Sequence, residues 1–564
     1  MKTLKKIPPL VYALLLLVGV NYLASLAYER LDLTQDKRYT LSDPAKEVLD
    51  QIKSPLVIDV FLEGDFTAEF KKLQSETRFL LEEMRNYNPN LSFIFSNPIE
   101  EGSDAELVSQ QFTQFGMTPI PLKVKRNGKE TIQTVFPWAT ANHNAKAVPI
   151  ALAKNIAGAS PQEFVRASTQ NLEYSFIEGF NRLLNAKSKK IAVLKDNGEL
   201  PDARIADFLQ KLGETYSIAP FPMNSALEKP EQALQALQNT FDLIIVAKPT
   251  KAFTDKQKFV LDQYTMSGGN SLWLLDMVAM SNDSLILNDG KTLAFPRELG
   301  LKDLFFKYGA RINPTMVKDL YSAPLVVASG NGSNTSYTEL PWFYQPQVPG
   351  FNTHPINTNL EQPVKFNYAN PIELLKTAQT IDKTVLLASS PLSRIEGTPK
   401  QISIDEVGLE PREEDYTAGS QPLAVLLEGN FESVFKNRVQ PVELQQVRFR
   451  ESAKEPSKIV LIADGDFIAN DLDPAGNPQE LGFDYFTRKK YGNKEFLLNT
   501  VNYLLDDTGL INIRNKDIAL SFLDASKTAK TINKWQALCL GLPLLLLLVL
   551  GFLFYSLRKR RYAR

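Results

Sequence analysis

The sequence predicts a mixed α/β protein whose two domains lie between two transmembrane helices. The first observation is a pair of long uncharged segments, Leu10–Ala27 and Ala537–Leu557, near the two ends of the chain. An α-helix rises about 1.5 Å per residue, so such segments approach or reach the ~30 Å of a hydrocarbon core. The second observation is that short apolar, β-rich runs alternate with segments of helical spacing between them, which is typical of sheets covered by helices.

The C-terminal segment is predicted to cross the membrane over residues 535–557, with the end of the chain in the cytoplasm. Trp535 and Tyr555 lie near its two ends, where their amphipathic rings favour the lipid headgroups. The tail 558–564 is rich in Lys and Arg, and short basic tails stay on the cytoplasmic side. The residues before this helix are therefore expected outside the cytoplasm.

The N-terminal segment, residues 1–28, is predicted to be a second anchor of opposite direction. Met1–Lys6 is basic and precedes the uncharged run, as in a secretory signal, and Ser25-Leu26-Ala27 would fit a cleavage site. Because the run exceeds the ~7–15 residues of a signal core, we favour an uncleaved anchor and keep cleavage as the alternative. Both ends would then lie in the cytoplasm, with two passes through the membrane and residues of about 30–530 outside the cytoplasm.

Charge and residue usage exclude several function classes. The chain has 63 Lys and Arg against 64 Asp and Glu, and because cations gather at its two ends the middle is acidic, which argues against a nucleic-acid partner. The single cysteine, Cys539, lies in the C-terminal segment, so the exported part can form no internal disulfide, thiolate metal site or thiol nucleophile. Two histidines, His143 and His354, offer little for zinc or for a His-based triad. We therefore expect no enzyme activity, no cofactor and no metal.

Residues 29–185 are predicted to form a first α/β domain. Ser42 and Pro44 mark a helix start, as its cap and first-turn residue. This β-α-β-α-β-β region has the element order of a thioredoxin-like fold. Its expected elements are the strand Leu56–Leu62, the helix Phe66–Tyr87, the strand Leu91–Phe95, the helix Asp104–Phe115, and the strands Leu122–Arg126 and Glu130–Phe136 around the hairpin turn Asn127-Gly128.

Two positions in this domain bear on the thioredoxin comparison. A thioredoxin carries C-x-x-C after its first strand, where this chain has Gly64–Thr67, so the redox chemistry is absent. Pro121 precedes the expected third strand, where thioredoxin-like proteins hold a cis proline, so a cis bond is predicted there. The alternative is that Pro119 and Pro121 stiffen a trans connection into an edge strand.

Residues 186–530 are predicted to form a larger α/β domain. Its strands are continuous apolar runs that alternate with helices, which indicates a parallel sheet covered on both faces, Rossmann- or flavodoxin-like. The stretch near 329–380 is polar and then Pro-, Asn- and aromatic-rich, and we expect an irregular insertion packed over the sheet. Helices are expected from Asp202, over Thr254–Ser267 and over Glu495–Leu505. The expected strands are Lys190–Leu194, Phe241–Ala247, Asn270–Leu275, Val385–Ser389, Leu423–Leu427 and Ile459–Ala463.

Four acidic residues form the candidate ligand crevice: Glu199, Asp276, Asp464 and Asp466. Each follows a predicted strand, and open α/β sheets bind ligands outside the carboxyl ends of their strands. The competing interpretation is structural, because exposed loops are polar and Asp caps the element that follows. An EF-hand is excluded because the loop from Asp464 lacks Gly at position six and Glu at position twelve. We expect these residues to be non-catalytic, since no Ser or Cys nucleophile with a basic partner accompanies them.

Five short motifs carry a resemblance to a known family: Arg30–Thr34, Tyr39–Ser42, Asn197–Leu200, Asp464–Phe467 and Gly492–Asn499. With an anchor at each end, the chain resembles the ABC-transporter auxiliary family, in particular its gliding-motility-associated members. The resemblance implies an envelope subunit that works with an ABC permease subunit and a cytoplasmic ATPase subunit. This sequence has no Walker A motif, so the ATPase would be a separate chain.

Three functions of different classes remain open. The preferred one is a membrane-anchored accessory subunit whose outer domains dock the permease and envelope partners, glycan or protein. The second is a periplasmic receptor for a sugar or a peptide, which would use the crevice at the strand ends. The third is an enzyme with a degenerate site, and it fits least because nucleophiles are lacking.

Overall fold

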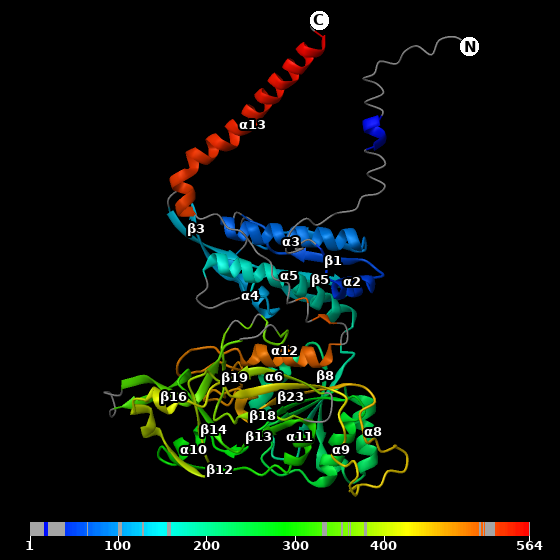
Figure 1. Ribbon diagram of the computed structural model, residues 1–564, viewed down its shortest axis with the longest axis vertical. Helices are drawn as coiled ribbons and strands as arrows, with labels where there is room; N and C mark the ends of the chain where they lie inside the picture. Colours follow the sequence, from blue (N-terminus) through cyan, green and yellow to red (C-terminus); the bar gives the residue numbers. More distant parts are fainter. Residues whose placement is uncertain are drawn as a thin grey trace, which may run out of the picture. The chain divides into compact units, whose positions relative to one another are not determined.

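The computed structural model describes residues 16–20, 40–64, 66–99, 104–126, 129–154, 160–185, 187–329, 336–350, 354–358, 360, 362–376, 381–506, 509–510, 513 and 525–562. The chain divides into two compact units, Met1–Asp517 and Ile518–Arg564. The first unit contains two α/β domains of different size, each with its own central sheet (Figure 1).

A four-stranded sheet organises the smaller domain, in the order β2-β1-β5-β6. β1 runs parallel to β2 and antiparallel to β5, and β6 pairs antiparallel with β5. Phe70 and Phe164, from two long helices α3 and α5, stack with ring centroids 5.6 Å apart, so these helices pack against each other. The elements are β1 (Leu56–Val60), β2 (Leu91–Phe95), β5 (Trp138–His143), β6 (Lys146–Ala151), α2 (Asp43–Asp50), α3 (Ala68–Tyr87), α4 (Ala105–Gln114) and α5 (Pro161–Leu184).

The helix start expected at Ser42 is confirmed. The Ser42 hydroxyl accepts a hydrogen bond from the Ala45 N–H at 3.4 Å, and Pro44 lies in the first turn of α2. The backbone N–H of Ser42 donates to the buried Glu173 carboxylate at 2.8 Å, which ties the start of α2 to α5.

The expected hairpin is present, but it is not part of the main sheet. β3 (Ile120–Arg126) and β4 (Lys129–Val135) pair antiparallel and form a two-stranded sheet of their own; the residues between them, 127–128, lie outside the described part of the chain. The prediction that they are the third and fourth strands of the main sheet is wrong, because β5 and β6 take those places. β5 is rich in small and polar residues and has weak strand propensity, yet its Ala139 is fully buried by its neighbours.

The cis bond predicted at Pro121 is also wrong. Among the described residues the peptide bond with cis geometry is Thr398–Pro399. Pro121 lies opposite Thr134 within the hairpin, so it is not the residue that precedes the third strand of the main sheet. The thioredoxin-like assignment of this domain stays a prediction.

A seven-stranded sheet forms the centre of the larger domain, in the order β19-β22-β23-β10-β9-β7-β8. β8, β7, β9, β10 and β23 run parallel, whereas β22 is antiparallel to both of its neighbours. All six predicted strands are present, but the prediction of a parallel sheet fails at β22 and omits β8. The strands are β7 (Lys190–Lys195), β8 (Ser217–Pro222), β9 (Leu243–Ala247), β10 (Asn270–Leu274), β19 (Ile381–Ala388), β22 (Pro422–Gly429) and β23 (Ser457–Ile462).

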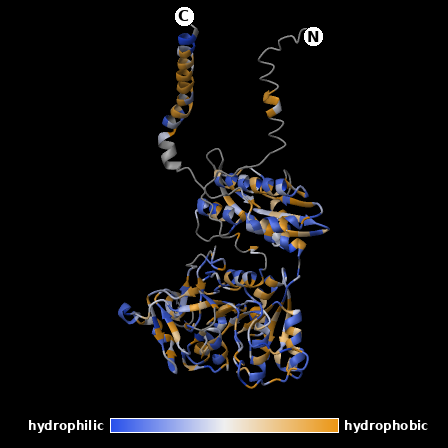
Figure 2. Cartoon of the chain, turned by 45° about the vertical axis from the view of Figure 1, so that its right-hand side comes forward, coloured by the Kyte–Doolittle hydropathy of each residue, from blue (hydrophilic) through white to orange (hydrophobic). Residues whose placement is uncertain are grey.

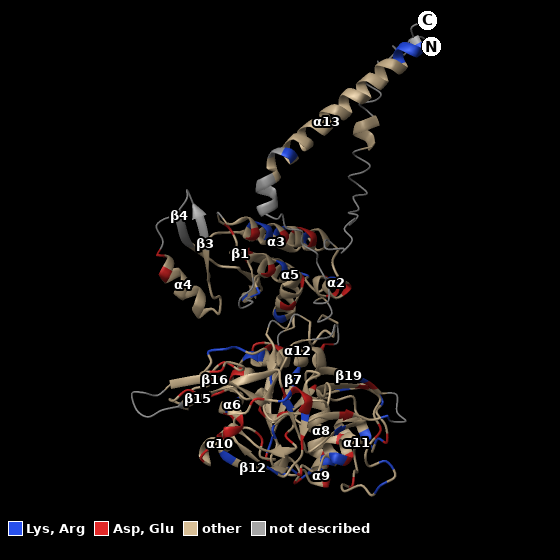
Figure 3. Ribbon diagram, turned by 60° about the vertical axis from the view of Figure 1, so that its left-hand side comes forward, with Lys and Arg blue, Asp and Glu red and all other residues tan. Residues whose placement is uncertain are grey.

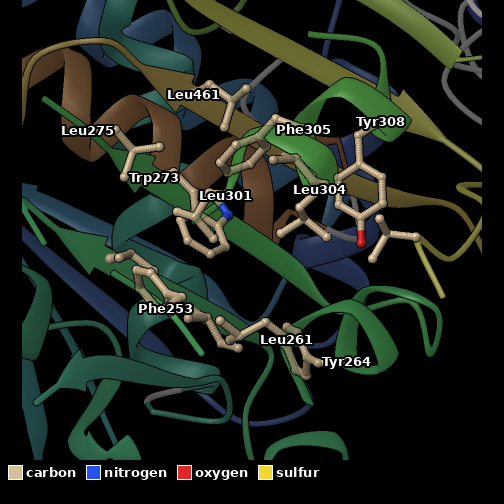
Figure 4. Close-up of a cluster of buried hydrophobic side chains, with 14 of the residues drawn as sticks. Phe253, Leu261, Tyr264, Trp273, Leu275, Leu301, Leu304, Phe305, Tyr308 and Leu461 are labelled. Atoms are coloured by element: carbon tan, nitrogen blue, oxygen red, sulfur yellow. The ribbon is translucent and has the colours of Figure 1, made fainter. Parts of the chain in front are cut away.

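Helices cover both faces of this sheet. On one face, α8, α9 and α11 share a buried cluster with Trp273 of β10, whose ring meets those of Phe253 and Phe305 at 6.1 and 5.2 Å (Figure 4). On the other face, α6 and α12 contribute Phe208 and Phe496 to a second cluster. Strands that are apolar on both sides are thus buried on both sides. The helices are α6 (Asp202–Gly213), α8 (Pro230–Thr240), α9 (Asp255–Thr265), α11 (Lys302–Tyr308) and α12 (Asn493–Leu505).

The segment near 329–380 contributes buried side chains to the cluster on the α12 face of the sheet, and part of it is regular rather than irregular. β15 (Ser322–Ser329) and β16 (Ser336–Val348) form an antiparallel ribbon, and β17 (Val364–Lys365) pairs with the end of β16. Val364 and Phe366 are buried in the same cluster as α12. The remaining elements of the domain are short: α7 (Met223–Ala226), β11 (Val278–Ala279), α10 (Asn282–Leu287), β12 (Lys291–Pro296), β13 (Ala310–Ile312), β14 (Met316–Asp319), β18 (Ile372–Leu374), β20 (Ser393–Glu396), β21 (Lys400–Ser403), η2 (Ile404–Gly408), η3 (Glu413–Asp415) and η4 (Gly465–Ile468).

The second unit contains one long helix, α13 (Ala525–Tyr562). Its segment Lys534–Arg561 is long and apolar enough to cross a membrane and includes the predicted residues 535–557. Figure 2 shows apolar residues along this helix, and Figure 3 shows Lys and Arg gathered at its C-terminal end. It is the one candidate span within the described residues. The predicted N-terminal anchor, Leu10–Ala27, lies mostly outside them; its residues 16–20 are helical.

Candidate functional site

The carboxyl ends of the parallel strands carry the candidate residues. β23, β10 and β9 are neighbours in the sheet, so the loops that follow them meet at one edge. Asp464 and Asp466 follow β23 and Asp276 follows β10, as the sequence predicts. Lys248, which follows β9, lies among them and was not found by sequence reasoning.

Five charged residues form one network at this edge, which we call the strand-end cluster: Lys248, Asp276, Arg297, Asp464 and Asp466. The Lys248 ammonium pairs with Asp466 Oδ1 and lies 3.5 Å from Asp276 Oδ2. Arg297 Nη1 lies 3.8 Å from the same Asp276 oxygen. Lys248 has a φ of 54°, a left-handed conformation that is strained for a residue with a side chain. The two carboxylates and the strained backbone together fix the lysine in place.

Asp464 acts as a cap and a clamp. Its side chain is fully buried, and its two oxygens accept hydrogen bonds from the Asp466 N–H at 2.8 Å and the Asn367 N–H at 2.6 Å. The first bond caps η4, which is the contact that the structural interpretation of this loop predicts. Between these two aspartates, Gly465 leaves room for the lysine side chain, because a Cβ at this position would lie 2.5 Å from Lys248 Cγ.

Burial controls protonation in the strand-end cluster. It raises the pKa of Asp464 well above the ordinary value, and the charges of Asp276 and Asp466 raise it further. Burial likewise raises the pKa of Asp276, against the opposing charge of Lys248. For Lys248, burial acts to lower the pKa, but the charges of Asp276 and Asp466 outweigh it and the pKa is raised. The lysine therefore stays charged, and Asp464 keeps its proton to higher pH than an exposed aspartate does.

Asp466 is the cluster member best placed to meet a ligand. Its side chain is 23% exposed, whereas those of Lys248 and Asp276 are 12% and 7% exposed. What Asp466 offers is a carboxylate that already holds an ammonium group. Such a pair suits hydrogen bonding to a polar ligand.

Glu199 does not join the cluster. β9 lies between β7 and β10, and the Glu199 carboxylate accepts a hydrogen bond from the Asn197 N–H of its own loop at 2.7 Å. The Asn197 carbonyl in turn accepts from the Thr250 and Lys251 N–H groups at 2.9 and 2.8 Å. The strand order reverses between β7 and β9, and sheets of this kind bind ligands at such a point. Here the two loops hydrogen-bond to each other across it.

The inserted segment covers the next part of this edge. The Asn370 side-chain oxygen accepts a hydrogen bond from the Met277 N–H, beyond the end of β10, at 2.7 Å. Asn493, at the start of α12, accepts from the Lys365 N–H at 2.9 Å and donates to the Lys365 carbonyl at 2.8 Å. These contacts fix residues 365–370 over the strand ends, so part of the chain itself occupies the place where a ligand would bind.

The motif Gly492–Asn499 is the sequence signal for this closure. A Cβ at Gly492 would lie 2.4 Å from the Gln362 carbonyl oxygen, so glycine lets the inserted segment approach α12. Asn499 donates to the Ile356 carbonyl at 3.0 Å from the same helix. Asparagine is a poor helix former, and two of the three asparagines in α12, Asn493 and Asn499, are buried. Buried asparagines in a helix indicate a side-chain role, but the sequence does not identify the backbone groups that they bind.

A polar cavity of about 130 Å³ lies beside Asp466. Each of its two cations, Arg204 and Lys365, has a carboxylate partner, at 3.5 and 3.2 Å. The described residues contain no group of three or more His, Cys, Asp and Glu that could hold a metal ion. The cavity is therefore suited to water or a small polar molecule. It is lined by Arg204, Ser281, Asn282, Asp283, Lys365, Asn367, Asp466, Phe467, Ala469, Asp471, Leu481, Gly482, Phe483 and Asn493.

Comparison with known proteins gives one family match over more than half of the chain. Residues 188–500 match the family described as an ABC-type uncharacterized transport system, and residues 35–142 match a domain of unknown function, DUF7088. No curated protein matches the chain. Among solved structures, it is similar to one titled mmIFT52 N-terminal domain, with 12% identity and a TM-score of 0.30, over 57% of this chain and 99% of that chain. A likeness of that size carries no functional argument.

Proposed function

Since the chain belongs to the ABC-transporter auxiliary family, described as an ABC-type uncharacterized transport system, we propose that it is a non-enzymatic accessory subunit of an ABC transporter. Its partners would be an ABC permease subunit, a separate cytoplasmic ATPase subunit, and an envelope glycan or protein. α13 would anchor it in the bacterial inner membrane, with the segment 10–27 as a second anchor. The bulk of the chain would then lie in the periplasm, with both ends in the cytoplasm.

The observation that carries this proposal is the closed strand-end edge of the larger sheet. The buried aspartates there bind backbone groups and a lysine of the same chain, and residues 365–370 cover the strand ends. A receptor or an enzyme of this fold class would keep that edge open for its ligand. A closed edge leaves the outer surfaces of the two domains as the parts that meet partners, which suits a docking subunit.

Co-purification tests the proposal. The full chain with an affinity tag after Arg564, extracted in mild detergent, is expected to bring down a permease and an ATPase. A variant that lacks residues 1–28 and 525–562 is expected to lose both, because it can no longer reach the membrane. Asp466→Ala serves as the matched control and is expected to retain both. Recovery of the full chain without a permease or an ATPase would contradict the proposal.

We also propose that the transporter serves gliding motility. This rests on the resemblance of the five motifs to the gliding-motility-associated members of the family. A strain that lacks the chain is expected to stop spreading on surfaces, and the full chain is expected to restore spreading. Normal spreading of that strain would leave the transporter role intact and remove the motility role.

A ligand receptor is the second candidate, and the polar cavity beside Asp466 is the observation that favours it. Titration calorimetry of the full chain against envelope sugars and short peptides tests it. Heat of binding that disappears in Asp466→Ala would support a receptor. The accessory role predicts no such heat.

A further inference from the structure

β2 is an open edge of the smaller domain's sheet. It is the last strand in the order β2-β1-β5-β6, and among the described residues no strand pairs with its outer side. Its sequence, Leu-Ser-Phe-Ile-Phe, contains neither a charged residue nor a proline. Proteins usually protect an edge with such residues, because unpaired backbone groups on an apolar strand recruit another strand.

The other edges of the two central sheets carry such protection. β6, at the opposite edge of the smaller sheet, contains Pro149, and β8, at one edge of the larger sheet, contains Pro220 and Pro222. On β19, the other edge of the larger sheet, the Leu386 carbonyl accepts a hydrogen bond from the Asn357 side chain at 2.6 Å. β2 differs from all three.

The backbone groups that β2 presents outward can be identified from its pairing with β1. The Asn90 carbonyl accepts from the Leu56 N–H, and the Ser96 N–H donates to the Val60 carbonyl, each at 2.9 Å. Alternate residues of a parallel strand point their backbone groups to the same side, so Ser92 and Ile94 also face β1. The N–H and C=O groups of Phe93 and Phe95 therefore point away from the sheet. The Leu91 carbonyl also points away from the sheet, whereas the Leu91 N–H donates to the Asn88 carbonyl at 3.1 Å.

The side chains of β2 leave room for a second strand. Ser92 and Ile94 lie on one face and are exposed, Ile94 to 60%. On the other face, the rings of Phe93 and Phe95 are covered by the guanidinium groups of Arg85 and Arg78 of α3, 5.2 and 4.0 Å from the ring centroids. β2 itself carries no charged side chain on either face.

We propose that β2 pairs with β2 of a second copy of this chain, antiparallel and about a two-fold axis at Phe93. Phe93 then exchanges two backbone hydrogen bonds with its own counterpart, and Phe95 N–H donates to the Leu91 carbonyl of the partner, twice by symmetry. The result is a continuous eight-stranded sheet. Ser92 of one copy lies directly opposite Ile94 of the other, and no charge on one strand meets a like charge on its neighbour.

The strand favours a second copy over a strand from another protein because it is self-complementary. Its two free N–H donors, at Phe93 and Phe95, meet the free carbonyls of Phe93 and Leu91 in their own two-fold image. A five-residue edge alone buries little surface, so two soluble chains would pair weakly. Two chains confined to one membrane meet at a much higher effective concentration, and a weak symmetric contact then suffices. The pairing itself does not depend on the transporter role.

Cysteine cross-linking of the full chain in membranes tests the register. In a Cys539→Ser background, the double variant Ser92→Cys/Ile94→Cys places the two sulfur atoms of neighbouring copies on directly opposite residues, whose Cα atoms lie about 4.5 Å apart, within disulfide range. Either single variant places its sulfur opposite a residue without one, with the like Cα atoms about 8 Å apart. Mild oxidation is expected to convert most of the double variant to a covalent dimer and little of either single variant.

A proline substitution supplies the independent test. The Phe93 N–H points away from β1, so Phe93→Pro removes no hydrogen bond within the sheet but blocks the two-fold pairing. In the double-cysteine background it is expected to abolish the covalent dimer, whereas Phe93→Val, which keeps the N–H and suits a strand, is expected to retain it. A folded double-cysteine variant that gives no dimer, equal cross-linking of the single variants, a cross-link to a protein of another mass, or a dimer that survives Phe93→Pro would each overturn the proposal.

Discussion

Asp464 illustrates how a residue can have the position of a ligand-binding group and the contacts of a structural one. It follows a strand at the edge where α/β sheets bind ligands, yet it is fully buried, and both of its oxygens accept backbone N–H groups. A buried carboxyl group that binds backbone on both sides of a loop holds two segments together. Its value to the fold is therefore measurable as stability.

Asp464→Asn is expected to destabilise the larger domain. The amide oxygen can still accept a hydrogen bond from one of the two N–H groups, of Asp466 or of Asn367. The amide NH₂ then faces the other N–H, which loses its acceptor. Leaving a buried donor without its acceptor costs about 1–3 kcal/mol. The midpoint of denaturant unfolding, followed by tryptophan fluorescence, measures the effect. Asp405→Asn is the control: this side chain is 74% exposed, and its contacts with Lys291 and Ser403 lie at the surface, so the midpoint should move much less. Equal midpoints for the two variants would contradict the clamp role.

The stability lost in Asp464→Asn is expected to depend on pH with a definite sign. Burial raises the pKa of Asp464 in the folded chain above its value in the unfolded chain, so between those two values the folded chain binds more protons. Stability from this group is then fully present below the unfolded pKa and falls as the pH rises through the folded pKa. Asparagine does not titrate. The difference in unfolding free energy between the parent and Asp464→Asn should therefore be largest at the acid end and shrink as the pH rises. A difference that grows with pH would mean that the carboxyl group is ionised in the folded chain.

At the scale of elements, the sequence predicts what depends on local periodicity and misses what depends on partners. The start of α2 follows from Ser42 and Pro44, and the six apolar strands of the larger domain follow from their composition. The direction of β22 cannot be predicted in this way, because an apolar run has the same composition whether its strand is parallel or antiparallel to its neighbours. β8 was missed because its two prolines and half-exposed residues suit only an edge.

The candidate site was predicted in part, for the same reason. Asp276, Asp464 and Asp466 meet because the strands that they follow are neighbours, but strand order cannot be predicted from the sequence. Glu199 follows β7, which lies on the far side of β9. Lys248 was missed because a lysine after a strand is ordinarily solvated. The closure of the edge by residues 365–370 was also missed, since it depends on which backbone groups the asparagines reach.

Gly492→Ala is expected to loosen this closure. The new Cβ would lie 2.4 Å from the Gln362 carbonyl oxygen, a backbone atom that can move only with the inserted segment. Overpacking of this kind costs about 1–3 kcal/mol. Hydrogen exchange at the amides of residues 362–370 should become faster and the unfolding midpoint should fall. Gly213→Ala, at the end of α6 where a Cβ meets open space, is the matched control and should be neutral or stabilising by up to about 1 kcal/mol. Unchanged exchange in Gly492→Ala would show that the contact is not tight.

At the scale of the whole molecule, the two units suit different roles: the first suits contact with partners, and the second suits a membrane. In the first unit, the chain itself covers the strand ends of the larger sheet, whereas β2, the edge strand of the smaller sheet, stays open. The second unit has an apolar helix that ends in Lys and Arg. A chain built in this way would meet its partners at exposed surfaces and strand edges, so the side of the membrane on which the domains lie decides which partners it can reach.

The proposed topology rests on the charges that flank α13, and it can be tested directly. Lys559, Arg560 and Arg561 lie in its last turn, and basic residues beside a membrane helix stay on the cytoplasmic side. Protease added to spheroplasts should therefore digest a tag inserted after Gly476, an exposed turn of the larger domain, and spare a tag after Arg564 until detergent is added. A tag before Met1 should also be spared if the N-terminal segment is an uncleaved anchor, and should be missing from the mature chain if that segment is a cleaved signal. Digestion of the tag after Arg564 in intact spheroplasts would reverse the orientation and place the domains in the cytoplasm.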